Sequence, residues 1–243
     1  LGKVEDGSTV SDYDKMEKEK GYSISTSIVP VEYEKVKINF LDTPGFFDFI
    51  GEVEGALRAV EAAAILVDAS SGVQVGTEKA WNFCKKKGMP RFFIINKTDK
   101  ENVDVSAVVE ELKEKFGTSV ATLDDRDALS EAIAETDEEL MEKFFDVGEF
   151  TDEEFAQGLI NGIGSGDIAP VLDCSAVKGE KIAEVLDAIV KYVPTATGKE
   201  YETVDGETVK CDPAGKMSAF VFKTIADPFL GKISLAKVIS GKI

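Results

Sequence analysis

Apolar residues along this chain follow two alternating spacings, one typical of β-strands and one typical of α-helices. The strands are expected at residues 27–33, 36–41, 64–67, 91–95 and 169–174. Helices are expected from the apolar spacing between Ile50 and Ala64, and over residues 77–87 and 182–193. Because strands and helices alternate, the pattern predicts an α/β fold with a doubly wound, mostly parallel sheet.

Helical spacing continues between residues 101 and 160, where the chain becomes strongly acidic. This stretch holds 19 Asp and Glu against four Lys and Arg, a balance of −15 within a total charge of −18. Its apolar residues form three helical stripes: Val105, Val108, Val109, Leu112 and Phe116; Leu129, Ile133, Leu140 and Phe144; Phe155, Leu159 and Ile163. The acidic faces of these helices are either simply exposed to solvent or form a docking surface for a basic patch on a partner.

The pattern changes after residue 193. Residues 194–199 form a turn-rich linker, and strands are expected at 217–224 and 232–239, around a turn at Asp227 and Pro228. We therefore expect one domain over residues 1–193 and the beginning of a β-barrel domain over residues 200–243.

Composition excludes several classes of chemistry. There is no histidine, which removes Ser-His and Cys-His nucleophile pairs and His-ligated metal sites. The sequence contains no run of eighteen apolar residues, so no membrane span is predicted. The three widely separated cysteines, Cys84, Cys174 and Cys211, indicate reduced thiols in a cytoplasmic protein.

Three short motifs follow expected strands, where α/β sheets bind ligands. In the first, Asp42-Thr43-Pro44-Gly45, an aspartate can hold Mg²⁺ through water and a glycine N–H can approach a terminal phosphate. The same four residues are also compatible with a plain turn. The motif by itself therefore leaves both interpretations open.

The second and third motifs point to a guanine base. In Asn96-Lys97-Thr98-Asp99, the Asp99 carboxylate can accept hydrogen bonds from guanine N1 and N2, and the aliphatic part of Lys97 can lie along the base. Asn96 can tie neighbouring loops together. In Cys174-Ser175-Ala176, the small residues allow the Ala176 N–H to approach guanine O6. Together, in this order, the motifs predict a guanine nucleotide site.

With these motifs the chain resembles the translational GTPases, and among them elongation factor G and its paralogues. The segment from Gly7 to Ile24 resembles the first switch, in which Ser23 stands where the family has a Mg²⁺-binding threonine. Asp42 to Gly45, followed by Phe49, Glu52 and Val53, resembles the second switch. The resemblance implies a P-loop-NTPase-type sheet, GTP or GDP with Mg²⁺ as ligands, and Asp42, Gly45, Asn96, Lys97, Asp99, Ser175 and Ala176 as GTP-binding residues.

The resemblance also implies partners. Glu138 to Phe144 and the helix that starts at Thr151 resemble the insert of elongation factor G, here at about residues 120–165, which contacts the ribosomal stalk protein. We therefore expect a cytoplasmic, monomeric factor that acts on the ribosome, with the acidic helices as the stalk-binding surface.

Three features depart from the family pattern. No G-x-x-x-x-G-K-[ST] phosphate loop occurs, and in the family this loop lies upstream of the segment that matches Leu1. The chain passes directly from Leu123 to Asp124, and the insert is therefore shorter here than in the family. Phe46 stands where active factors carry the histidine that orients the attacking water. We expect a GTPase with attenuated hydrolysis; the alternatives are a GTP-responsive ribosome-binding paralogue with little or no hydrolysis, and a ribosomal protection protein.

Overall fold

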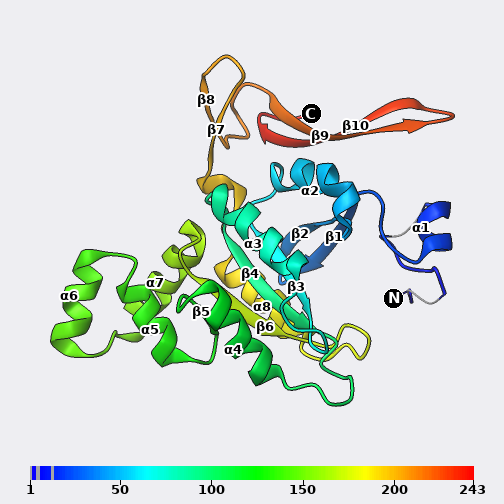
Figure 1. The fold of residues 1–243 in the computed structure, drawn as a ribbon. Helices are drawn as coiled ribbons and strands as arrows, with labels where there is room; N and C mark the ends of the chain where they lie inside the picture. Colours follow the sequence, from blue (N-terminus) through cyan, green and yellow to red (C-terminus); the bar gives the residue numbers. More distant parts are fainter. Residues whose placement is uncertain (1, 4–5, 12–13) are drawn as a thin grey trace. The chain divides into compact units, whose positions relative to one another are not determined.

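A computed structural model describes residues 2–3, 6–11 and 14–243 (Figure 1). Asp12 and Tyr13, within the stretch that resembles the first switch, lie outside the described residues. The chain forms two compact units. We call Ala62–Pro194 the sheet unit, and Leu1–Glu61 together with Thr195–Ile243 the hairpin unit.

The sheet unit is built on four parallel strands in the order β3-β4-β6-β5. The strands are β3 (Ala63–Asp68), β4 (Arg91–Asn96), β5 (Val120–Thr122) and β6 (Ala169–Asp173). The helices that connect them include α3 (Val75–Lys86) and α4 (Val105–Phe116), and α8 (Ile182–Tyr192) follows β6. The parallel α/β sheet expected from the sequence is confirmed; the three-residue β5 was not predicted, because it is too short to show a period.

Helices cover both faces of this sheet, as the alternation of side chains along β4 requires. Phe93 and Ile95 are fully buried and pack with residues of α3 and α4, including Trp81. Phe92, on the opposite face, lines a small apolar pocket with Ala188 and Ile189 of α8. Five consecutive buried residues in β4 explain why its sequence is almost continuously apolar.

The acidic stretch folds as a helical extension with its own core. Its helices are α5 (Arg126–Ala134), α6 (Glu138–Val147) and α7 (Asp152–Ser165). Asp125, Asp137 and Thr151 cap their N-termini through side-chain oxygens. The second and third predicted stripes contribute to a second core cluster that includes Leu129, Ile133, Leu159 and Ile163, and the second stripe is divided between α5 and α6. The first stripe lies on α4 and packs in the core of the sheet.

The hairpin unit begins with α1 (Lys15–Lys20) and the antiparallel pair β1 (Ser27–Tyr33) and β2 (Val36–Asp42). A single 3-10 turn, η1 (Phe47–Phe49), leads into α2 (Ile50–Leu57). The expected helix is therefore shorter than its apolar spacing suggests, and Ala64 lies in β3. Sequence spacing could not separate the end of a helix from the start of a buried strand.

The C-terminal part of the hairpin unit contains a 3-10 turn and four antiparallel strands. These are η2 (Ala196–Gly198), β7 (Glu200–Glu202), β8 (Thr208–Lys210), β9 (Ser218–Asp227) and β10 (Gly231–Ser240). β9 ends three residues later than the predicted strand 217–224 and includes Asp227, which was expected in the turn, whereas β10 is one residue longer at each end than the predicted strand 232–239. The two long strands resemble the start of a β domain. Among the described residues, no helix has the length and apolarity needed to cross a membrane.

Candidate guanine nucleotide site

The loops that follow β4 and β6 meet because these strands are parallel neighbours. Ile95 pairs with Asp173 in the register, so Asn96 and Cys174 leave the sheet at the same edge. The backbone N–H of Thr98 donates to the Cys174 carbonyl at 3.4 Å. The fold thus brings together the second and third motifs, which lie far apart in the chain.

Asn96 joins the two loops through its side chain, which bonds the backbone of Lys97 and of Ala176. Its Oδ1 accepts hydrogen bonds from the N–H of Lys97 at 2.7 Å and from the N–H of Ala176 at 3.0 Å. This is the loop-tying role expected of Asn96. The Ala176 N–H, expected to face guanine O6, donates to Asn96 in this structure.

Asp99 is an exposed carboxylate oriented by a buried hydroxyl. Ser175 is fully buried, and its Oγ donates to Asp99 Oδ1 at 2.5 Å while accepting from the Lys178 N–H at 3.2 Å. The bond from Ser175 lowers the pKa of Asp99 below its ordinary value. Asp99 is therefore an ionised acceptor at neutral pH, and its remaining lone pairs are available to a pair of donors such as guanine N1 and N2.

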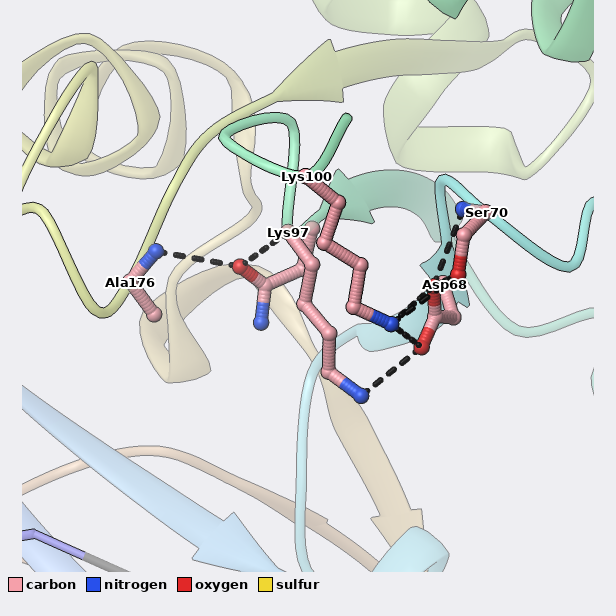
Figure 2. Close-up of polar contacts among 6 residues, drawn as sticks. Asp68, Ser70, Lys97, Lys100 and Ala176 are labelled. Carbon is pink, nitrogen blue, oxygen red and sulfur yellow. Dashed lines mark hydrogen bonds and ion pairs between the residues drawn. The ribbon is translucent and has the colours of Figure 1, made fainter. Parts of the chain in front are cut away.

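An ion-pair cluster at the end of β3 was not anticipated. Asp68 pairs with Asn96 in the parallel register, which brings it to the same sheet edge (Figure 2). Its carboxylate accepts from Lys97 Nζ at 2.7 Å, from Lys100 Nζ at 3.2 Å and from Ser70 Oγ at 2.6 Å. The bond from Lys97, followed by the bond from Ser70, holds the pKa of Asp68 far below its ordinary value.

This cluster also defines the conformation of Lys97. Its backbone is left-handed, with φ of 67°, and its ammonium reaches back to Asp68 across the top of the sheet. The aliphatic part of the side chain therefore spans the edge between β3 and β4, half exposed. In the sequence, the one sign that Asp68 belongs to this edge is its position directly after the predicted strand 64–67.

The switch-like residues belong to the hairpin unit. Asp42 pairs with Ser27 in the β1-β2 register, so the segment that carries Ser23 enters the hairpin at the end where Asp42 leaves it. Phe46 is 52% exposed, and its ring meets Tyr22 edge-on with centroids 4.7 Å apart. A side chain at Gly45 would have nothing within 4 Å, so this backbone is open to approach.

A magnesium ion in this unit would need oxygen donors. Among the residues that the structure describes, no three His, Cys, Asp or Glu side chains are grouped so that they could hold a metal. Ser23 and Asp42 are oxygen donors at one end of the hairpin, and Mg²⁺ in nucleotide sites takes few protein ligands, with phosphate and water completing the shell. A hydroxyl and a carboxylate are therefore chemically suited to a Mg²⁺ ion that a nucleotide also binds.

A separate cavity of about 690 Å³ opens where β5 and β6 end, between α4 and α8. Two ion pairs line it, Lys113 with Asp125 at 3.1 Å and Lys181 with Asp173 at 2.7 Å. None of the residues predicted to bind GTP lines this cavity. The edge of the sheet therefore carries two distinct polar regions.

Comparison with known proteins identifies the family and the fold of this chain. Residues 2–195 match the family described as the elongation factor Tu GTP binding domain. A crystal structure of ttk003000868 from Thermus thermophilus is similar, with a TM-score of 0.83 and 27% sequence identity. The match covers 99% of this chain and 41% of the other, so this chain spans less than half of that protein. The chain belongs to the translational GTPases that share this domain.

Proposed function

We propose that the chain is the GTP-binding part of an elongation factor G-like translation factor that acts on the ribosome. It binds GTP and hydrolyses it to GDP and phosphate: water attacks the γ-phosphorus, the bond to the bridging oxygen breaks, and one proton is released. The observation that carries this proposal is the joined pair of loops, in which Asn96 bonds Ala176 and Ser175 orients Asp99.

In this proposal the site residues contact the base, the γ-phosphate or Mg²⁺. Asp99 accepts from guanine N1 and N2, Lys97 lies along the base, and Asn96, Ser175 and Ala176 shape the base pocket. Gly45 approaches the γ-phosphate, and Ser23 and Asp42 hold Mg²⁺, Asp42 through water. When bound, Mg²⁺ neutralises charge on the phosphates.

The base assignment is tested by Asp99→Asn. The test uses the protein as its gene encodes it, so that any residues before Leu1 or after Ile243 are included. An amide cannot accept from both guanine N1–H and N2–H, but it can donate to the extra oxygen of xanthine. We expect guanine nucleotide affinity to fall about 100-fold, because two charge-assisted hydrogen bonds are lost. The affinity for xanthine nucleotides should rise.

Asp205→Asn, an exposed aspartate in the turn between β7 and β8, is the control and should leave both affinities unchanged. Affinities are measured by titration of fluorescent GDP and XDP analogues. Unchanged guanine preference in Asp99→Asn would remove Asp99 from the base pocket and with it the main support for the proposal.

A second candidate function is a GTP-responsive ribosome ligand with little or no hydrolysis. Phe46 favours it, because this side chain cannot hydrogen-bond a water molecule and instead packs on Tyr22. Losing one orienting donor typically costs about 10²–10³ in rate. Single-turnover GTP hydrolysis with and without ribosomes separates the two functions, since a rate equal to that of histidine-containing factors excludes the second.

The acidic helices are proposed as the surface for the ribosomal stalk protein. On α6, Phe145 is 80% exposed and Val147 62% exposed, beside Glu142 and Asp146. Exposed apolar residues on the same helix as exposed carboxylates fit a partner surface that combines basic and apolar groups. Phe145→Ser should weaken binding to the purified stalk protein, whereas Phe229→Ser, on the β9-β10 turn, should not.

A further inference from the structure

Three charged side chains from three elements of the hairpin unit hold the short segment that follows Ser23. The segment is Ile24–Thr26, and the side chains are Glu17 of α1, Glu52 of α2 and Lys223 of β9. These contacts join separate parts of the chain, since Glu52 lies 26 residues from Thr26 and Lys223 lies 197 residues from it. Each contact can therefore report on tertiary structure.

Glu17 holds the first half of the segment. It is buried, at 2% exposure, and its Oε1 accepts from the N–H groups of Ile24 at 2.9 Å and Ser25 at 3.1 Å. Its other oxygen accepts from the Asp14 N–H at 3.4 Å, which completes the capping box of α1. The buried carboxylate thus fixes the backbone directly after Ser23 to the helix before it.

Glu52 and Lys223 hold the second half. Glu52 Oε2 accepts from the Thr26 N–H at 2.6 Å, and Lys223 Nζ donates to the Thr26 carbonyl at 2.6 Å. Lys223 also donates to Ser25 Oγ and forms an ion pair with Glu52 at 3.2 Å. Both backbone polar groups of Thr26, which is 3% exposed, are therefore bonded by one carboxylate–ammonium pair.

The pair is shielded and tightly supported. The Lys223 side chain is only 7% exposed, so removing Glu52 would leave a poorly solvated ammonium group; the Glu52 side chain is 33% exposed. At Gly55 of α2 an added Cβ would lie 2.9 Å from the Phe222 carbonyl, which shows how closely α2 and β9 approach. The Arg58 guanidinium lies over the Phe220 ring, 4.7 Å from its centroid. These contacts hold Lys223 against Glu52.

We propose that Glu52 and Lys223 are positioning residues: they lock Ser25 and Thr26 to both α2 and β9, and so set the position of Ser23 toward Mg²⁺. The part that concerns Mg²⁺ rests on the proposed function. The locking itself does not, because it concerns only the described contacts. Lys223 of β9 would thus hold together the two segments that resemble the switches, one through Thr26 and the other through Glu52. In the family, the switches surround the nucleotide.

The lock is tested first without any nucleotide. Hydrogen exchange is measured for the Ile24–Thr26 amides in the protein as its gene encodes it, and in Lys223→Met, Glu52→Gln and the double variant. Each single change should raise exchange of the Thr26 amide about tenfold or more, because it weakens the charge-assisted hydrogen bonds of this residue, whereas the Ile24 and Ser25 amides stay bonded to Glu17. The double variant should exchange no more than about as fast as the faster single variant, because both changes break one unit.

Lys232→Met, an exposed lysine on β10, is the matched control and should leave exchange unchanged. Lys223→Arg keeps the charge and should recover part of the protection, and circular dichroism verifies that each variant is folded. Unchanged exchange in Lys223→Met, or effects of the single changes that multiply in the double variant, would overturn the lock. Should Lys223→Met not fold, Glu52→Gln and Lys223→Arg decide by the same readout.

The positioning role is tested by the Mg²⁺ requirement. In Lys223→Met, the Mg²⁺ concentration for half-maximal GTP binding should rise about tenfold, while affinity for GDP without Mg²⁺ stays within about twofold. Raised exchange with an unchanged Mg²⁺ requirement would reduce the pair to a structural contact and overturn the positioning role. If the unaltered protein binds no guanine nucleotide, the proposed function fails, and the exchange experiment still decides whether the lock exists.

Discussion

Asp68 shows how a single carboxylate can organise the edge of the sheet. Two ammonium groups, from Lys97 and Lys100, and the Ser70 hydroxyl converge on it. Lys97 is also the residue expected to lie along the base, so its ammonium is anchored while its aliphatic part remains along the edge. The carboxylate therefore contributes both to stability and to the shape of the candidate site.

The charge of Asp68 gives a pH-dependent stability. Its folded-state pKa lies below its ordinary value of 3.8, so its stabilisation is fully present above that value and is lost as pH falls through the folded-state pKa. Asp68→Asn should lower the free energy of unfolding at pH 7 by less than about 1 kcal/mol, as for partly exposed pairs.

Urea denaturation at pH 7, 5 and 3 measures this effect. The difference between Asp68→Asn and the unaltered protein should be constant from pH 7 to 5 and smaller at pH 3. Asp205→Asn serves as the control for a general charge effect. A difference that grows on acidification would contradict the assignment of the ion pairs to Asp68.

Phe46 is the second residue at which a single substitution tests the candidate site. Phe46→His restores a group that can orient water beside Gly45, so ribosome-stimulated GTP hydrolysis should rise about 100-fold. Single-turnover assays with the protein as its gene encodes it measure the rate. Phe229→His adds the same imidazole on a 95% exposed side chain and should have no effect. An unchanged rate in Phe46→His would mean that another group already orients the water.

At the scale of elements, α7 shows why its glycines are not interchangeable. An added Cβ at Gly158 would lie 2.5 Å from Ile133 Cγ2, and one at Gly162 would lie 2.5 Å from Ile168 Cδ1. Both isoleucines are fully buried, so they cannot easily move aside. A Cβ at Gly164, in the same helix, would meet nothing within 4 Å.

These contacts predict opposite effects within one helix. Gly158→Ala and Gly162→Ala should each lower the free energy of unfolding by about 1–3 kcal/mol, because the crowding exceeds the gain in helix propensity. Gly164→Ala should be neutral or should stabilise by up to about 1 kcal/mol. Chemical denaturation of the three variants measures the changes. Equal effects at all three positions would show that α7 does not pack as described.

At the scale of the whole molecule, the two units differ in what stabilises them. Both large core clusters lie within the sheet unit, between Ile65 and Tyr192. In the hairpin unit, ionic groups connect the elements: Lys223 bonds Glu52, and Lys237 bonds Glu61 and Tyr201. Apolar burial is roughly proportional to the area removed from water, so the sheet unit has the larger hydrophobic stabilisation.

The separate cores predict that residues 62–194 fold without the remainder of the chain. The isolated fragment should show a cooperative thermal transition and slow exchange of the β4 amides. A fragment of residues 91–194, which lacks β3 and α3 and therefore Trp81, should lose this cooperativity. A non-cooperative transition in the longer fragment would mean that its core depends on the hairpin unit.

Local spacing in the sequence determined the type and order of most elements. Periods near 3.6 and 2 residues follow from helix and strand geometry, so α4, α7, α8 and the strands β1, β2, β4 and β6 could be predicted from neighbouring residues alone, whereas the break between α5 and α6 could not. The Asn96–Asp99 and Cys174–Ala176 motifs could be recognised for the same reason, since each is contiguous. The end of α2 and the three-residue β5 could not, because a boundary or a short strand contains less than one clear period.

Tertiary structure decided which side chains meet. Asp68 reaches Lys97 because parallel strands end at one edge, and Ser175 orients Asp99 because β6 lies beside β4. Lys223 reaches Thr26 only because β9 packs on α2. The sequence alone therefore determined the chemical groups and the loops that carry them. Their hydrogen bonds and charge states depend on distances between residues far apart in the chain, which only the folded arrangement sets.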